Sequence, residues 1–287
     1  MVSINADPTC PFEAYFGLDM DLEYTCVATF RGGEAQLVPF NKQGFLIPSL
    51  VYCESENSFK FGLDAQKMQR KNPHKCFKNV KLALGLSHSD KLAKLYQQRY
   101  AETVLQRSAS HDSAQAEEPC VFKIAVEDGF VIRSPQELAA LILQRFHAEA
   151  KTHINLRPEA SSLTVLSVPT WYESPQKMAL YEAARQAGLA HVATIKEPLA
   201  AVKAYCLDEI NALNENIIVL KLDHDLCEVS LVRQDFPGRP DIMSNRLSWE
   251  LNGMVFIRKV LNYLFDQIKL QNNQRYFSPD EQQIIEK

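Results

Sequence analysis

The chain has 287 residues, of which 46% are hydrophobic and 23% charged, and its formal net charge is -4. A chain of this length buries about three quarters of its unfolded surface, and it can form one large domain or two smaller ones. The acidic balance argues against a nucleic-acid-binding face, although the segment 67–81 contains several lysines and arginines. No apolar stretch approaches the roughly 18 residues that a membrane span needs, and the N-terminus lacks the pattern of a secretory signal. We therefore expect neither a nucleic acid nor a membrane as a partner.

The seven cysteines are scattered along the chain, and no two of them form a Cys-x-x-Cys pair. A zinc site is therefore not indicated. An odd number of dispersed cysteines is typical of reduced thiols in a cytosolic protein. We expect a cytoplasmic location and no metal.

The first part of the chain predicts strands. Short apolar or alternating runs occupy 16–19, 25–30, 35–38 and 49–53, and glycine-rich or polar turns separate them. This pattern favours an antiparallel start to a mixed sheet. Two helices are then expected, one at 64–70 that ends before Pro73 and one from Asp90 to about Leu105. The polar, serine- and alanine-rich segment 107–118 is predicted to be a flexible loop.

The middle of the chain changes to alternating strands and helices. A hairpin with an Asp-Gly turn is expected at 121–132. The sequence Ser134-Pro135-Gln136-Glu137 is a capping box that opens a helix running to about His153. Strands at 163–168 and 191–195 then alternate with helices at 174–187 and 197–207, which predicts parallel pairing in an α/β sheet.

Strands begin again after residue 216. Three are expected at 217–222, 227–232 and 242–247, followed by a helix at about 249–268 and another that opens at Ser278. We therefore predict a first lobe over 1–212 and a second over 213–287. The second set of elements is small for a sheet that needs both faces covered, which predicts an incomplete lobe.

The segment 163–208 carries a detailed resemblance to one family. It reads as a strand, a Val-Pro-aromatic-aromatic turn, a helix, Ala-Gly-Leu, a second strand, Glu-Pro and Ala-Ala-x-x-Ala-Tyr. The matching residues are Pro169, Trp171, Tyr172, Gln176, Lys177, Ala187, Gly188, Leu189, Glu197, Pro198, Ala200, Ala201, Ala204 and Tyr205. This pattern resembles the nucleotide-binding domain of the seventy-kilodalton heat-shock chaperone family. Weaker similarity at 16–30, 38–51, 72–85 and 216–232 extends the resemblance over most of the chain.

The resemblance implies a fold and a branch of the family. The fold is the α/β, actin-like (ribonuclease-H-like) ATPase fold, with the first lobe complete and the second truncated. Lys81 in its Val-Lys context, the following Gly-Leu-Ser-His-Ser-Asp, and Lys221 in the second hairpin resemble the atypical, ribosome-associated branch more than the heat-inducible members.

The first phosphate-binding loop of the family reads Gly-Ile-Asp-Leu-Gly-Thr-Thr-Tyr-Ser, and it corresponds to residues 17–25 here. Asp19 is retained, and its family counterpart lies beside the magnesium. The Gly-Thr-Thr that would cradle phosphate is replaced by Asp21, Leu22 and Glu23. Glycines in such loops let backbone N–H groups approach the anion, so this loop is expected to be lost as a phosphate site.

The second phosphate-binding loop of the family reads Asp-Leu-Gly-Gly-Gly-Thr-Phe-Asp. The sequence here has Lys221 in place of the first carboxylate, and the glycines and threonine are replaced by Asp223, His224, Asp225 and Leu226. Further on, the family's Leu-Gly-Gly-Glu-Asp-Phe-Asp resembles 251–257. Asn252 and Gly253 remain there as remnants of a nucleotide-binding segment, and both acids are gone.

Other residues that the resemblance identifies are retained. Lys81 occupies the position of the lysine near the γ-phosphate, Glu197 is kept, and Pro169 and Lys177, together with Glu197, match the relay that communicates nucleotide state to the neighbouring domain. We expect Asp19, Lys81 and Glu197 to be remnants of a catalytic site and no residue to be catalytic.

The acidic substitutions oppose nucleotide binding. Each like-charge contact at about 4 Å costs around 4 kcal/mol at an intermediate dielectric, against the roughly 8 kcal/mol behind a micromolar affinity. Two interpretations of the acids remain open. They are solvated turn residues, or Asp19, Asp21, Asp223 and Asp225 supply oxygens to a cation.

The sequence therefore predicts a degenerate, non-hydrolysing relative of these chaperones, a pseudo-ATPase that acts as a co-chaperone or docking platform in protein folding and needs no cofactor. A J-domain co-chaperone or the ribosome is the expected partner. The alternative is an ATP-dependent folding chaperone with weak residual nucleotide binding, for which ATP and Mg would be the cofactors.

Overall fold

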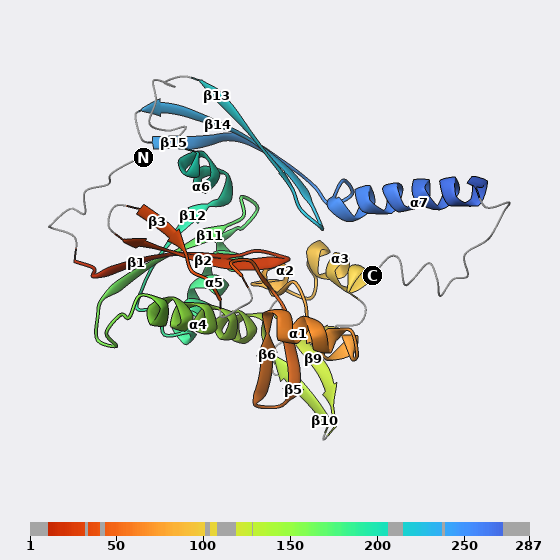
Figure 1. The fold of residues 1–287 in the computed structure, drawn as a ribbon, viewed down its shortest axis with the longest axis horizontal. Coiled ribbons are helices and arrows are strands. Elements are labelled where there is room, and N and C mark those ends of the chain that lie inside the picture. Colours follow the sequence, from red (N-terminus) through yellow and green to blue (C-terminus); the bar gives the residue numbers. More distant parts are fainter. Residues whose placement is uncertain are drawn as a thin grey trace. The chain divides into compact units, whose positions relative to one another are not determined.

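The computed structural model describes residues 11–31, 34–40, 44–100, 104–107, 119–127, 129–205, 215–236 and 239–271. The chain divides into two compact units, Met1–Ala200 and Ala201–Lys287 (Figure 1). The expected lobe boundary at 212/213, the predicted flexible loop beyond Arg107 and the helix predicted from Ser278 lie outside the described residues.

A six-stranded mixed sheet forms the centre of the first unit (Figure 1). Its strands are β1 (Ala14–Met20), β2 (Tyr24–Arg31), β3 (Glu34–Leu37), β4 (Ile47–Pro48), β11 (Ser162–Val168) and β12 (His191–Lys196). Their order is β12-β11-β1-β2-β3, with β4 paired to β2. β1 and β2 are antiparallel, whereas β1–β11 and β11–β12 are parallel. This confirms the antiparallel start and the parallel pairing that the sequence predicts.

Two helices of the first unit are α4 (Pro135–His153) and α5 (Ser174–Gln186), and α6 (Glu197–Ala204) begins directly after β12. α4 packs against β1 and β2 and against α5, and the core lies between it and the sheet. The capping box at its start is confirmed. The Glu137 amide donates to Ser134 Oγ (3.1 Å), and the Ser134 amide donates to Glu137 Oε2 (2.7 Å).

Two smaller antiparallel sheets complete the described part of the first unit. The first contains β5 (Val51–Ser55), β6 (Ser58–Phe61) and β7 (Cys76–Phe77), with α1 (Gly62–Gln69) and the short helix η1 (Pro73–Lys75) beside it. The second contains β8 (Val104–Arg107), β9 (Cys120–Val126) and β10 (Gly129–Arg133). The connecting helices are α2 (Val80–Ala83) and α3 (Lys91–Arg99).

One helix prediction is wrong at its end. The sequence predicts a helix from Asp90 to about Leu105, but α3 ends at Arg99, and Leu105 lies in β8, opposite Phe122 of β9. Pairing with a strand that lies well beyond it in the sequence determines the conformation of this segment. Such long-range pairing outweighs a weak local helix preference.

The second unit contains the three strands that the sequence predicts. β13 (Asn216–Leu222), β14 (Cys227–Phe236) and β15 (Arg239–Ser248) form an antiparallel sheet in that order, and α7 (Gly253–Gln271) follows it. In the part of the chain that the structure describes, no helix has both the length and the apolar character required to cross a membrane.

Gly85, just after α2, makes a close approach that only glycine permits. Its φ is +65°, and a Cβ at this position would lie 2.6 Å from the carbonyl oxygen of Pro175 and 2.8 Å from the Cα of Gln176. These are backbone atoms of the first turn of α5, so they cannot move aside as a flexible side chain would. Gly85 thereby fixes the segment after α2 against α5.

We predict that Gly85→Ala lowers the free energy of unfolding by about 3 kcal/mol, because left-handed strain of about 1 kcal/mol adds to a backbone collision. Gly188 is a matched control, since its φ is +77° and a Cβ at that position would meet no atom within 4 Å. Gly188→Ala should lower the free energy of unfolding only by the left-handed backbone strain of about 1 kcal/mol. Urea unfolding of both variants measures the difference, and equal losses would show that the contact with α5 is unimportant.

His147 is a titratable group in the core of the first unit. It lies on α4, is 8% exposed, and packs edge-on against the ring of Phe16 at 5.1 Å. Its Nε2 has no hydrogen-bond partner. Burial, with a smaller contribution from Lys151, lowers the pKa of His147 to about 4. The imidazole is therefore neutral in the folded protein at physiological pH.

The unfolded chain binds this proton with the ordinary pKa of 6.5, so it takes up the proton before the folded chain does. We predict that His147 lowers the free energy of unfolding by up to about 3 kcal/mol as the pH falls from 6.5 to about 4. His147→Gln should remove this part of the pH dependence, whereas His153→Gln, on the exposed end of the same helix, should leave it. Urea unfolding across this range tests both, and identical pH profiles for wild type and His147→Gln would contradict it.

Candidate functional site

Lys81 is a buried lysine on the short helix α2. Only 3% of it is exposed. Asn79 precedes the helix in the left-handed conformation, with φ of 48°, and the Tyr172 hydroxyl donates to the Lys81 carbonyl at 2.6 Å. The turn before α2 and the segment after β11 therefore hold the backbone from which the ammonium extends.

Three carboxylates from two neighbouring segments surround this ammonium. Lys81 Nζ lies 2.6 Å from Glu197 Oε1, 3.3 Å from Asp21 Oδ1 and 3.9 Å from Asp19 Oδ1. Asp19 lies in β1, Asp21 follows this strand, and Glu197 is the first residue of α6. Asp19 also accepts a hydrogen bond from the Ser167 hydroxyl of β11. We call Lys81, Asp19, Asp21 and Glu197 the Lys81 cluster.

The charges of the Lys81 cluster depend on one another. Burial by itself would lower the pKa of Lys81, but the three carboxylates outweigh this effect, and the pKa lies well above its ordinary value. The ammonium is therefore charged throughout the physiological range. The side chain of Asp19 is 44% exposed. Its pKa is nevertheless raised, because the surrounding protein excludes water from the carboxylate. The positive charge of Lys81 opposes this rise in pKa, and the negative charge of Asp21 adds to it.

The first hairpin turn, between β1 and β2, is closed by its own groups. The Asp21 amide donates to the Tyr24 carbonyl at 3.1 Å, and the Glu23 carbonyl accepts from the Ser49 amide at 2.8 Å. Leu22 is 3% exposed and belongs to the core. A buried leucine thus anchors the turn where the family resemblance has a threonine.

The second hairpin turn, between β13 and β14, has a similar closure. The Asp223 amide donates to the Leu226 carbonyl at 2.8 Å. The Asp223 side chain accepts from the His224 amide at 2.9 Å through Oδ1 and lies 3.4 Å from Lys221 Nζ through Oδ2. His224 Nδ1 lies 3.4 Å from the buried carboxylate of Asp225. Each of these charged side chains therefore has a partner within the turn or next to it.

The start of α7 packs on this second turn. Its first two amides, of Gly253 and Met254, donate to the carbonyls of Asp223 (2.8 Å) and His224 (3.1 Å). The third amide, of Val255, donates to Asn252 Oδ1 at 2.9 Å. A Cβ on Gly253 would lie 3.0 Å from the Asp223 carbonyl oxygen. Asn252 therefore caps α7, and Gly253 allows its close approach to the turn.

The structure brings several of the sequence-predicted residues together. Asp19, Lys81 and Glu197 meet in the first unit, and Lys221, Asp223, His224, Asp225 and Leu226 adjoin Asn252 and Gly253 in the second. Pro169 is buried directly after β11, and its carbonyl accepts from the Tyr172 amide at 3.3 Å. Lys177 lies half-buried on α5. The relay role of Pro169, Lys177 and Glu197 stays a prediction.

Sequence reasoning missed three contacts of this site. The sequence predicts Asp21 to be a solvated turn residue or an oxygen ligand of a cation, whereas the structure pairs its carboxylate with the Lys81 ammonium. Ser167 and Tyr172 were not assigned any part in the site. The predicted parallel pairing could have indicated Ser167, because β11 runs beside β1 with Leu166 opposite Leu18 and therefore places Ser167 next to Asp19.

The fold and the site define a class of protein. The mixed sheet begins with antiparallel strands and continues with alternating strands and helices. Two tight hairpin turns each contact a lysine. This arrangement is consistent with an actin-like ATPase domain. The chain belongs to the Hsp70 family, since the family model described as Hsp70 protein matches residues 15–284. Membership in this family indicates a nucleotide-binding fold and a chaperone-like function.

We predict that Lys81→Met lowers the free energy of unfolding by about 3–5 kcal/mol, because its removal leaves three close carboxylates without their cation. Adding Glu197→Gln to Lys81→Met should recover part of this loss. The exposed Lys94 of α3 is the control, and Lys94→Met should change the stability by less than about 0.5 kcal/mol. Urea unfolding measures all four proteins, and similar losses for both lysine variants would contradict a structural role for the cluster.

Proposed function

We propose that this Hsp70-family chain is a non-hydrolysing relative that serves as a co-chaperone or docking platform in protein folding. The observation that carries the proposal is the Lys81 cluster. The lysine that the family resemblance places near the γ-phosphate has its charge compensated by Glu197 at 2.6 Å and Asp21 at 3.3 Å. A phosphate would have to compete with these carboxylates for the ammonium.

Asp21 makes this competition unfavourable for an anion. It replaces a glycine of the phosphate loop in the family pattern, so a phosphate bound near this turn would meet a carboxylate in place of backbone N–H groups. Like charges at such distances repel by several kcal/mol at an intermediate dielectric. The first turn is thus suited to hold Lys81 and unsuited to hold phosphate.

The second turn supports the same proposal for a different reason. Backbone amides at a tight turn and at a helix start are the donors that bind phosphate in proteins. The amides of His224, Gly253 and Met254 already donate to acceptors of the protein itself. A phosphate would have to displace these bonds and approach the Asp223 carboxylate as well.

A docking role requires a partner from the folding machinery. The resemblance to the atypical, ribosome-associated branch makes a J-domain co-chaperone or the ribosome the partner that we propose, in the cytoplasm. The alternative function is that of an ATP-dependent folding chaperone with weak nucleotide binding, and it follows from family membership alone.

We predict that millimolar ATP with Mg leaves the melting temperature unchanged. A ligand at 100 times its dissociation constant would add about 2.7 kcal/mol to the free energy of unfolding, which corresponds to a rise of a few degrees. Differential scanning fluorimetry gives the melting temperature, and isothermal calorimetry measures binding directly. Sodium sulfate with MgCl2 at matched ionic strength controls for general salt effects.

A rise that requires both ATP and Mg would overturn the proposal and favour the alternative function. Release of phosphate from radiolabelled ATP, at a rate that Lys81→Met abolishes, would overturn it independently. Equal melting temperatures with ATP–Mg and with the matched salt would support it.

A further inference from the structure

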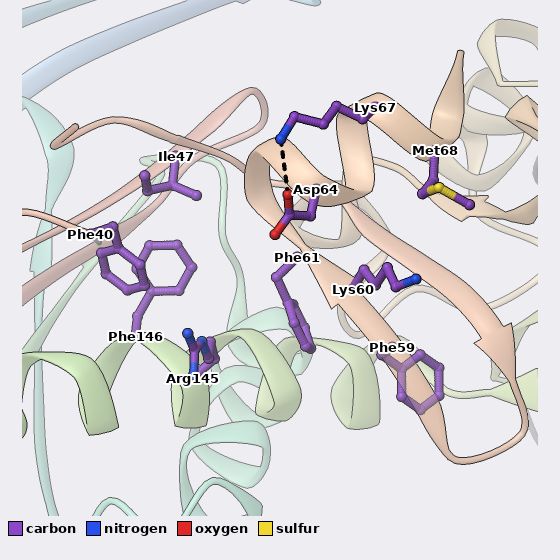
Figure 2. Close-up of a pocket in the computed structure, with 10 residues that line it drawn as sticks. All are labelled: Phe40, Ile47, Phe59, Lys60, Phe61, Asp64, Lys67, Met68, Arg145 and Phe146. Carbon is purple, nitrogen blue, oxygen red and sulfur yellow. Dashed lines mark hydrogen bonds and ion pairs between the residues drawn. The ribbon is translucent and has the colours of Figure 1, made fainter. Parts of the chain in front are cut away.

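The first unit contains a cavity of about 520 Å³ away from the Lys81 cluster. It is lined by residues of α1, β6 and α4 and by residues near β4 (Figure 2). This volume lies within the range of about 300–1,000 Å³ that is typical of ligand sites. By contrast, the void that Lys81 itself lines measures only about 10 Å³, hardly enough for one water molecule. The larger cavity therefore has room for a ligand, whereas this small void does not.

The floor of the cavity is apolar and buried. Phe40, Ile47 and Phe146 are each at most 5% exposed. The rings of Phe40 and Phe146 lie 4.2 Å apart at their centroids (Figure 2). Phe61 of β6 and Met68 of α1, which line the cavity above this floor, are only half-buried. A large apolar group in the cavity would cover these half-buried side chains, and burial of apolar surface is favourable.

The rim of the cavity is cationic. Lys60, Lys67 and Arg145 line it together with a single acid, Asp64, although the chain as a whole has a net charge of -4. Figure 2 shows these three cations distributed around Phe61, with Lys67 on the side of α1 and Arg145 on the side of α4. A ligand with an apolar group between separate negative charges would match this arrangement.

All three cations of the rim already pair with an acid, through ion pairs of the kind that can exchange. Lys60 pairs with Glu54 at 2.5 Å, and both side chains are more than a third exposed. Lys67 pairs with Asp64 at 3.2 Å, and both side chains are more than half exposed. Arg145 is 47% exposed and pairs with Glu149 at 3.4 Å, and its guanidinium has five N–H donors in all. Exposed pairs contribute little stability, so an incoming carboxylate can replace Asp64 or bind beside Glu149.

We propose that this cavity is a docking site for an acidic peptide segment that inserts one aromatic or large aliphatic side chain. Its flanking carboxylates would pair with Lys60 and Lys67 on one side and with Arg145 on the other. A nucleotide fits less well, because phosphates require donors gathered at one place, whereas these cations are spread around the apolar floor. The inference deepens the proposed docking role and rests on it for the peptide nature of the ligand.

The probe for this site is a fluorescein-labelled peptide, Glu-Glu-Asp-Phe-Asp-Glu-Glu, and fluorescence anisotropy measures its binding. Two comparison peptides isolate the two features of the cavity: one has Ser in place of Phe, and the other has Lys and Asn in place of the acids. The first peptide should bind to the wild-type protein, more weakly at high salt, and both comparison peptides should bind at least about tenfold more weakly.

Variants of the rim provide the second arm of the test. Arg145→Glu and Lys67→Glu should each weaken binding of the acidic peptide by about tenfold, and Arg145→Gln should have a smaller effect in the same direction. Arg185→Glu is the matched control, because Arg185 is also an exposed helical arginine that pairs with an acid of its own helix, Glu182, but does not line the cavity. It makes the same change in net charge and should bind like wild type.

Several outcomes would overturn the inference. Equal affinity for the three peptides, equal loss in Arg145→Glu and Arg185→Glu, or no binding would each do so. Displacement of the peptide by ATP would assign the cavity to a nucleotide, and self-association in sedimentation that Arg145→Glu abolishes would assign it to a second copy of the chain. If ATP–Mg stabilises the protein while the peptide still depends on Arg145, the docking site holds and the non-hydrolysing function fails.

Discussion

An ammonium that is almost completely buried is the constraint around which the first unit is arranged. Lys81 is 3% exposed, and a charge in such a position needs partners that repay its desolvation. Glu197 and Asp21 supply these at 2.6 and 3.3 Å. The partners come from α6, which follows β12, and from the turn after β1. One side chain therefore connects the short helix α2 to the two outer strands of the parallel part of the sheet. A change in any of these elements therefore affects the others.

Each hairpin turn is closed by a hydrogen bond between its own backbone groups. In the first, Asp21 closes the turn through its amide and binds Lys81 through its carboxylate. In the second, Asp223 closes the turn, accepts from the His224 amide and contacts Lys221. The Asp21 carboxylate contacts the Lys81 ammonium, and the Asp223 carboxylate accepts from a backbone amide of its own turn. In glycine-rich phosphate loops, backbone amides are available to donate to a bound anion. Here the amides of Asp21, Asp223 and His224 donate to oxygen atoms of the protein itself.

In the function that we propose, the chain keeps the Hsp70 fold and loses the chemistry of its phosphate loops. The antiparallel start and the parallel pairing are those that the sequence predicts, although side chains replace the glycines of both turns. A fold depends on many distributed apolar contacts, whereas a phosphate site depends on a few backbone amides and their access. The fold therefore tolerates substitutions that a phosphate site does not. The cavity lined by residues of α1, β6 and α4 is a part of the first unit with room for a ligand.

The sequence by itself determined the elements that local patterns encode. The capping box at Ser134 fixes the start of α4, and strand–helix alternation predicts β11, α5, β12 and α6 in order. Resemblance to the family also indicated that Asp19, Lys81 and Glu197 are remnants of one site. These inferences succeed because periodicity, caps and matched motifs are properties of neighbouring residues.

Only the tertiary structure decided which groups meet across the sequence. The segment at Leu105 is a strand because Phe122 lies opposite it, and no local pattern contains that information. Asp21 binds Lys81 across a separation of 60 residues, and the aromatic cavity joins Phe40 to Phe146. Contacts of this kind depend on the packing of whole elements, which fixes distances that the order of residues along the chain leaves open.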